Sequence, residues 1–389
     1  MRVYGRAAVS DFLGDRIVYR NLIPADERLP TLDEIRPVAG LPAGRIPRKN
    51  EAEYARVVVH LLKQARLLDA PGGHSGGHSG GHSAAQIKRL IFLGDTHMGD
   101  GTAFTNLCQV GGWPGLAFIA AETAQPEAVE ILPVALEQSL YLANRWSALS
   151  GFDCYCAEQD FPVDEATAVV VDLDKTAIGA RGRNAHTIDR ARVQAVQETV
   201  ADLLGPAFDQ PTFQAAYDQL DQPEFHPFTT DNQDYLAYIC LILGSGLYDP
   251  EQVVAEVRRG VLGSFRQFIN QVDAQRNSLP AGLEAIHAEI FANVQSGDPT
   301  PFKPFRRNEY LATIKWMGYL EDNTPVKKLL AEEIVLTQEV RAMALNWQAR
   351  GALLFGLSDK PDEASKPDPK QAEQGLKPIH RTETHAVGN

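Results

Sequence analysis

Residues 167–179, TAVVVDLDKTAIG, are the part of the chain that most directly indicates its fold. The first five are β-branched or apolar, which is typical of a strand buried on both faces of a sheet. Two carboxylates, Asp172 and Asp174, follow at the end of this run. Ligands of parallel α/β sheets bind beyond the carboxyl ends of the strands, and acidic groups there are costly unless a cation or a reaction uses them. The stretch therefore predicts an α/β sheet with a functional site after this strand.

Other apolar runs supply the rest of this sheet. Short runs that end at Gly, Ser or an acidic residue predict buried strands, and amphipathic periodicity predicts helices. The predicted strands are KRLIFLGD (88–95), GLAFIAAE (115–122) and GALLFGLS (351–358), with a short final strand near the C-terminus. The predicted helices are 51–69, 133–149 and 337–350, whereas residues 1–50 are predicted to be irregular.

Between residues 186 and 334 the pattern is helical, without a convincing buried strand. We expect helices at 189–204, 211–221, 231–244, 250–275, 279–295 and 308–319. The fold class is therefore a doubly wound, mostly parallel α/β sheet with a large all-helical insertion. We assign residues 1–185 and 335–389 to the α/β core and residues 186–334 to the helical domain.

The repeat GGHSGGHSGGHS (72–83) interrupts the core. Its histidines, His74, His78 and His82, are residues that bind zinc or nickel. However, ordering a Gly/Ser-rich segment costs about 1–2 kcal/mol per residue in backbone entropy. We therefore interpret the repeat as a flexible surface insertion.

Charge and composition exclude several functions. With 37 Lys and Arg against 50 Asp and Glu, the net charge of −13 does not suit nucleic-acid binding. No apolar run reaches the ~18 residues that cross a membrane. The first residues include Asp11, Asp15 and Arg16 where a signal peptide has its apolar core. Four cysteines without a CxxC pair do not suit a disulfide framework, so we expect a cytoplasmic protein.

Two strand ends carry a family resemblance. The DxDxT element from Asp172 to Thr176 resembles motif I of the haloacid dehalogenase (HAD) superfamily, whose first Asp is a nucleophile and whose second is a general acid and base. The strand that ends at Ser358 resembles motif II of that family, where a Ser or Thr binds the transferring phosphoryl group.

The remaining HAD motifs lie upstream rather than downstream of these two. GDTHMGD (94–100) resembles motif IV, with Asp95 and Asp100 as its acids. Lys49 precedes the helix that leads to this strand and matches the motif III lysine in position, with Arg48 as the alternative. The order III–IV–I–II resembles a circularly permuted HAD protein, and permutation is plausible because domain termini often lie close together. The helical insertion between motifs I and II corresponds to a C1-type cap.

The resemblance implies a Mg²⁺-dependent phosphatase that acts on a small phosphorylated metabolite through an aspartyl-phosphate. Asp172 is then the nucleophile and Asp174 the general acid and base, and Ser358 and Lys49 stabilise the phosphoryl oxygens. The implied Mg²⁺ ligands are Asp172, the backbone carbonyl of Asp174, Asp95 and Asp100.

Residues after motif I are candidates for substrate contacts, because HAD proteins carry a flap there. Thr176 is expected to order the motif I loop, and Arg181, Arg183 and Asn184 are the flap residues. Arginine binds phosphate and carboxylate groups through paired donors. Lys303, Arg306 and Arg307 form a second basic group, for which a solvated helix face or ion pairs between helices is the favoured interpretation.

Two other functions fit the same motifs. One is a sugar-phosphate mutase, which uses the same pair of aspartates. The other is a non-catalytic HAD-fold protein that binds a phosphorylated ligand or a protein partner. The sequence names neither the substrate nor the oligomeric state, and it leaves open whether a neighbouring chain completes the site.

Overall fold

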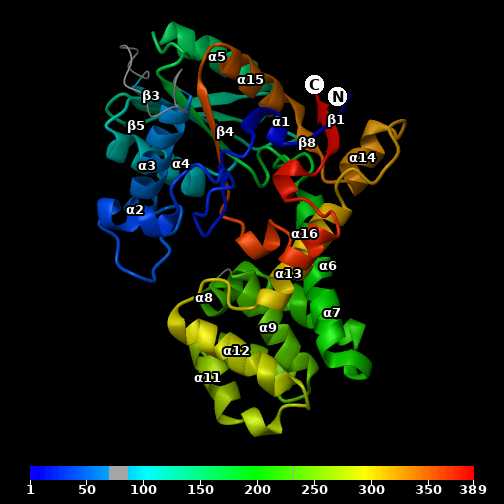
Figure 1. Ribbon diagram of the computed structural model, residues 1–389. Helices are drawn as coiled ribbons and strands as arrows, with labels where there is room; N and C mark the ends of the chain where they lie inside the picture. Colours follow the sequence, from blue (N-terminus) through cyan, green and yellow to red (C-terminus); the bar gives the residue numbers. More distant parts are fainter. Residues whose placement is uncertain (70–85, 231) are drawn as a thin grey trace. The chain divides into compact units, whose positions relative to one another are not determined.

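A computed structural model describes residues 1–69, 86–230 and 232–389 (Figure 1). The chain divides into two units, and each is described here by itself. The first comprises Met1–Asp189, Ile314–Lys366 and Ala372–Asn389, and the second comprises Arg190–Thr313 and Pro367–Gln371. The repeat at 72–83, predicted to be a flexible insertion, lies outside the described residues.

The first unit is built on a seven-stranded sheet in the order β2-β9-β7-β3-β4-β6-β5. All neighbouring pairs are parallel except β5 with β6, so the predicted mostly parallel α/β sheet is confirmed. The strands are β2 (Ile17–Val18), β3 (Arg89–Gly94), β4 (Gly115–Ala120), β5 (Val129–Ala135), β6 (Gln138–Ala143), β7 (Thr167–Asp172) and β9 (Leu353–Leu357).

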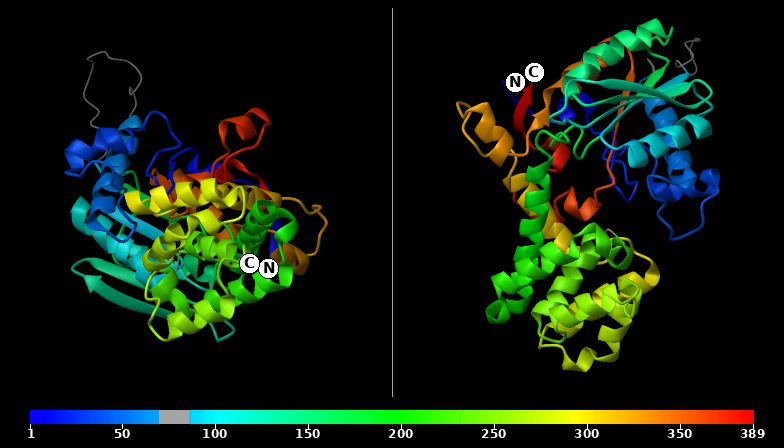
Figure 2. Two further views of the ribbon diagram at one scale, coloured as in Figure 1. Left: turned by 90° about the horizontal axis from the view of Figure 1, so that it is seen from below. Right: turned by 180° about the vertical axis from the view of Figure 1, so that it is seen from behind.

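Helices cover both faces of this sheet (Figures 1 and 2). On one face, α3 (Ala52–Leu68) and α4 (His97–Gly111) pack in one apolar cluster with Phe92 and Val170. On the other face, α5 (Leu149–Glu158) and α15 (Gln338–Ala349) meet where Phe152 lies between Phe118 and Trp347. Every residue of β7 is buried, as the apolar run of its sequence predicts for a central strand.

Residues 1–50 are more ordered than predicted. They contain β1 (Arg2–Ala7), α1 (Ser10–Leu13), β2 and α2 (Leu32–Ala39). Strand β2 has only two residues, which is too short to show the alternating hydrophobic pattern of a strand. Strand β1 joins a small second sheet, β1-β10-β8, with β10 (Thr384–Gly388) and β8 (Leu336–Thr337). The predicted final strand is thus confirmed as β10.

The helix predicted at 133–149 is wrong. This stretch contains the end of β5, a turn at Glu137 with φ 57°, and strand β6. Helix α5 begins only at Leu149. Strand β6 pairs in parallel with β4 along its whole length, so long-range sheet pairing overrides a local pattern that also fits a helix.

The second unit is helical, and no strand occurs among its described residues. It holds most of α6 (Ala185–Leu204), then α7 (Gln210–Leu220), α8 (His226–Thr229), α9 (Gln233–Gly244), α10 (Pro250–Arg258), α11 (Phe265–Ala274), α12 (Leu283–Ser296) and most of α13 (Lys303–Lys315). The single helix predicted at 250–275 is wrong: Gly260 takes a left-handed φ of 70°, and Ser264 caps a new helix, α11.

The chain returns to the first unit at Ile314, earlier than the predicted boundary at residue 334. Residues after Ile314 bond to the α/β core: Gly318 N donates to Thr384 Oγ1, and Arg6 donates to Leu320 O. Helix α14 (Val326–Glu332) adds Leu329 to an apolar cluster with Val335 and Val387. Among the described residues, no helix is long and apolar enough to cross a membrane.

Candidate active site at the carboxyl ends of three parallel strands

Three strand ends bring the predicted site residues together. Strand β7 lies between β3 and β9 and is parallel to both. Asp172 is the last residue of β7, Asp95 directly follows β3, and Ser358 directly follows β9. These strands are therefore side by side and parallel, although they are far apart in the sequence. One edge of the sheet therefore collects residues from three distant parts of the chain.

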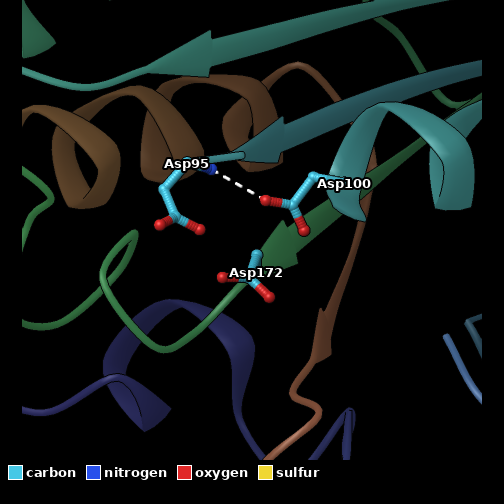
Figure 3. A group of neighbouring side chains, drawn as sticks. All are labelled: Asp95, Asp100 and Asp172. Atoms are coloured by element: carbon cyan, nitrogen blue, oxygen red, sulfur yellow. Dashed lines mark hydrogen bonds between the residues drawn. The ribbon is translucent and has the colours of Figure 1, made fainter. Parts of the chain in front are cut away.

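Asp95, Asp100 and Asp172 form a buried carboxylate cluster. Each offers one carboxylate oxygen, and these oxygens lie within 4.8 Å of one another. The exposed fractions are only 8%, 3% and 5%. Figure 3 shows the three side chains converging from β3, α4 and β7. Three anions at this depth need compensation, because desolvation penalises each charge.

Local backbone structure fixes Asp100 in this cluster. Its Oδ2 accepts hydrogen bonds from the backbone N–H groups of Asp95 (2.9 Å, the dashed line in Figure 3) and Thr96 (2.8 Å). Thr96 caps α4 and also donates its hydroxyl to the same oxygen. The side chain thus lies over the end of β3. Gly94 makes this approach possible, because a Cβ there would lie 2.6 Å from Asp100 Cβ.

Two cations contact the cluster. Lys49 Nζ lies 2.6 Å from Asp100 Oδ1 and 2.5 Å from Asp172 Oδ1, so it bridges two of the three acids. Arg181 Nε donates to Asp95 Oδ2. Of the two predicted candidates for the lysine position, Lys49 is therefore the one whose side chain reaches the acids. Three carboxylates facing two cations leave one negative charge without a partner.

Burial and the neighbouring charges shift the pKa values of these groups. Burial, together with the charge of Asp100, raises the pKa of Asp95 to about 6, although Arg181 opposes the shift. Burial and the neighbouring acids also hold the pKa of Asp172 well above its usual value, against the effect of Lys49. Burial opposes the charge of Lys49, but Asp172 and Asp100 outweigh it and keep the lysine pKa high. Lys49 therefore stays protonated.

Asp174 lies beside this cluster, outside the group of three. After β7 the chain turns through Lys175, which has a φ of 63°, and Ala177 N donates back to Asp172 O at 3.2 Å. The side chain of Asp174 is 26% exposed, which leaves it accessible to a reactant. This combination of a buried Asp172 and a more accessible Asp174 suits a nucleophile and a proton carrier.

Lys360 is a site residue that the sequence did not reveal. Its Nζ lies 3.8 Å from Asp174 Oδ2, and its side chain is only 3% exposed. Its backbone N–H donates to Ser358 Oγ at 3.1 Å, which holds the hydroxyl at the end of β9. The only available signal was its position two residues after Ser358, and a lysine before a proline is common in surface turns.

The predicted flap residues divide into two kinds. Arg181 contacts the acid cluster, as described. Arg183 is buried and donates to Glu122 and Glu339, and Asn184 is buried and bonds to the backbone of Leu330, Glu333 and Val335. These internal contacts account for Arg183 and Asn184 without a substrate, so their predicted substrate-binding role is not supported.

Thr176 and Tyr54 are buried beside the site with hydroxyls that have no hydrogen-bond partner among the described residues. Thr176 accepts a bond from the Thr337 hydroxyl through its backbone carbonyl at 2.6 Å, which fits the predicted role in ordering the loop. Tyr54 lies on α3, and burial raises the pKa of its phenol, with Lys49 opposing.

The donor set fits a hard divalent cation. All the nearby ligand atoms are carboxylate oxygens, which Mg²⁺ and Ca²⁺ prefer over the soft metals bound by Cys and His. Burial and the charge of Asp100 raise the pKa of Asp95, and a bound cation would favour its ionised form. Asp95, Asp100 and Asp172 would hold the ion.

A cavity of about 750 Å³ elsewhere in the first unit is a weaker candidate. It borders Gly351, which precedes β9, so it lies toward the opposite ends of the strands. Its acidic groups already have arginine partners: Asp69 pairs with Arg16, Asp26 with Arg28, and Asp15 with Arg381. The cavity therefore has no excess of acids comparable to that of the aspartate cluster.

Comparisons with protein-family models, curated proteins and solved structures gave no match.

Proposed function

We propose that this chain is a Mg²⁺-dependent phosphatase of the HAD type, circularly permuted, that hydrolyses a small phosphorylated metabolite through an aspartyl-phosphate. The observation that carries the proposal is the position of Asp172, which ends the central strand β7 with its carboxylate against Lys49 and two further acids. The four HAD-like motifs, although out of order in the chain, supply residues to one edge of one sheet. The proposal is supported further by Lys49, which precedes α3 and not a strand end, and yet reaches the same acids.

The chemistry begins with Asp172 as the nucleophile. One of its carboxylate oxygens attacks phosphorus in line, and the bond from phosphorus to the leaving oxygen breaks. Asp174 donates a proton to that oxygen, so the alcohol leaves neutral. Lys49 favours the ionised form of Asp172 through their 2.5 Å contact and offsets the charge of the phosphoryl oxygens. A bound divalent cation supplies further positive charge for these oxygens.

The second step regenerates the enzyme. Asp174, now ionised, takes a proton from a water molecule, whose oxygen attacks the aspartyl-phosphate. The bond between Asp172 and phosphorus breaks, and inorganic phosphate leaves with the carboxylate restored. The Ser358 hydroxyl, which accepts from Lys360 N, has its own proton available to donate to a phosphoryl oxygen. The helical unit is the proposed cap that selects the substrate.

The test is phosphate release from a panel of phosphorylated metabolites and p-nitrophenyl phosphate, with Mg²⁺ or with EDTA. We expect release only with Mg²⁺ and none from Asp172→Asn. Full activity in EDTA would contradict the metal assignment. Transfer of the phosphoryl group to a second hydroxyl, without phosphate release, would identify a mutase. Binding of a phosphorylated metabolite without any turnover would identify the non-catalytic alternative.

A further inference from the structure

Arg181 combines a backbone held by several hydrogen bonds with a side chain that is partly exposed to solvent. Its backbone N–H donates to Lys175 O at 2.8 Å, and its carbonyl accepts from Glu122 N at 3.0 Å and Trp146 Nε1 at 3.2 Å. The next residue, Gly182, has a φ of 76°, and a Cβ there would lie 2.0 Å from Glu122 O. The backbone is therefore fixed against the end of β4.

The Arg181 side chain extends from this fixed point to the cluster. Its Nε donates to Asp95, yet the side chain is 39% exposed while that of Asp95 is only 7% exposed. Lys49, by contrast, is 11% exposed and lies between two acids. Arg181 is thus the cation that reaches the cluster from the solvent side and has room to rotate away.

The contact also engages one of the two oxygens of a carboxylate that a metal ion would need. Asp95 is one of the three acids that would hold the ion, and its Oδ2 already accepts from Arg181. An oxygen that accepts a guanidinium N–H directs a lone pair to that donor instead of to a cation. The Arg181 guanidinium and a metal ion would each supply positive charge to the same excess of carboxylates. The site therefore needs only one of these two cations at a time.

We propose, on the basis of the proposed function above, that Arg181 and a divalent cation compete for Asp95, and that cation binding releases Arg181 to bind the anionic group of the substrate. In the absence of the ion, Arg181 neutralises Asp95. With the ion bound, the guanidinium turns outward on its fixed backbone and becomes a phosphate-binding group. Metal loading and substrate binding are thereby coupled through one side chain.

The coupling predicts opposite effects of one substitution on two ligands. Titration calorimetry of the full chain with MgCl₂ should show roughly 3- to 10-fold tighter binding to Arg181→Gln than to the wild type, as expected when a half-exposed ion pair no longer competes. Titration with inorganic phosphate at saturating Mg²⁺ should show roughly tenfold weaker binding to Arg181→Gln, because a charge-assisted hydrogen bond is lost. Arg181→Lys should give intermediate values for both ligands.

Arg350→Gln is the matched control. Arg350 also has a 39% exposed side chain in an ion pair, with Asp153, and its loss changes the net charge equally. It belongs to neither the acid cluster nor the flap, so both affinities should stay unchanged. Equal tightening of Mg²⁺ binding in this variant would mean that overall charge, rather than competition for Asp95, explains the effect, and would overturn the inference.

The remaining outcomes separate the inference from the proposed function. Unchanged or weaker Mg²⁺ binding to Arg181→Gln, with normal binding to the wild type, would overturn the inference alone. Unchanged phosphate binding would also overturn it, because Arg181 would then contribute nothing after its release. If neither protein binds Mg²⁺, the metal site and the proposed function fail together with it. An NMR signal of Arg181 Nε–H, assigned by its loss in Arg181→Gln, should shift toward that of a solvent-exposed arginine when Mg²⁺ is added.

Discussion

Each unit of this chain buries a cluster of charged side chains, and the two clusters differ in charge balance. In the helical unit, Asp234 and Glu309 face Arg306 and Arg192. In the α/β unit, three aspartates face Lys49 and Arg181. Counting only these described residues, the first set has equal numbers of acids and cations, whereas the second has one acid more than its cations. Depth of burial is therefore not what distinguishes a structural ion network from a candidate active site.

The helical cluster also satisfies its atoms internally. Arg306 donates Nε and Nη2 to Asp234 and Nη1 to Glu309, and Phe302 N donates to the other Asp234 oxygen. Burial raises the pKa of Asp234, but Arg306 opposes the shift. For Arg306, the predicted ion pair between helices is confirmed, because it joins α13 to Asp234 on α9. The α/β cluster instead has one acid more than the two cations that contact it among the described residues.

The largest effect that separates the two clusters concerns activity. Asp172→Asn should abolish phosphatase turnover, because an amide does not attack phosphorus usefully. Asp174→Asn should reduce turnover by roughly 10²–10⁴-fold, the contribution of general acid–base catalysis. With an activated aryl phosphate, the first step can survive in Asp174→Asn, so a phosphoryl adduct on Asp172 should accumulate and be detected by mass spectrometry.

Asp234→Asn is the corresponding control in the helical cluster. Measured where that variant remains folded, it should leave the chemical step unaffected. A phosphoryl group on a residue other than Asp172, or near-normal turnover in either Asp172→Asn or Asp174→Asn, would overturn the assigned roles.

The next largest effect concerns stability and should appear in the helical cluster. Arg306→Met leaves Asp234 and Glu309 buried without their shared cation. Breaking a buried ion network from one side costs about 3–5 kcal/mol, so urea denaturation followed by circular dichroism should show a loss of this size. A loss below about 1 kcal/mol would mean that the cluster is hydrated or rearranged, and the contrast between the two units would disappear.

Mg²⁺ should stabilise the α/β cluster and leave the helical one unaffected. A ligand that binds only the folded state at about 100 times its Kd adds about 2.7 kcal/mol to the free energy of unfolding. We expect the Tm of the wild type to rise with MgCl₂ relative to EDTA, and Arg306→Met to keep a comparable rise. Asp95→Asn should lose most of it. An equal rise in Asp95→Asn would place the ion elsewhere.

The central part of the fold could be predicted because its signals are local. The apolar runs that became β3, β4, β7 and β9 carry their own strand signature, and each is followed by Gly, Ser or an acid. Strand β6 and the two-residue β2 could not be predicted in this way, since their pairing with β4 and β9 determines them. The break between α10 and α11 depends on the left-handed Gly260, where a glycine within a helical pattern is ambiguous.

For the site, the acids were predictable and their partners were not. Asp172, Asp95 and Ser358 stand at strand ends, where sequence position alone indicates the shared edge. Tertiary contacts determine which arginine reaches the cluster. Arg181 donates to Asp95, whereas Arg183, two residues later, donates to Glu122 and Glu339. Lys360 has no sequence pattern of its own, and its proximity to Asp174 appears only when β9 lies beside β7.

The smallest effect is a pH dependence that tests the charge excess itself. Burial raises the pKa of Asp95 to about 6, from the usual value of about 3.9 for an aspartate, so the folded chain favours its protonated form. The associated stabilisation is present below about pH 4 and is lost as the pH rises through 6. In EDTA at pH 7.5, Asp95→Asn should therefore exceed the wild type in free energy of unfolding by about 1 kcal/mol, because the amide avoids burying a charge, although it weakens the contact with Arg181. At pH 4.5 the advantage should vanish, since Asp95 is then largely protonated. Denaturation curves at the two pH values measure the difference directly, and a variant less stable than the wild type at pH 7.5 would mean that Arg181 already compensates Asp95 in full.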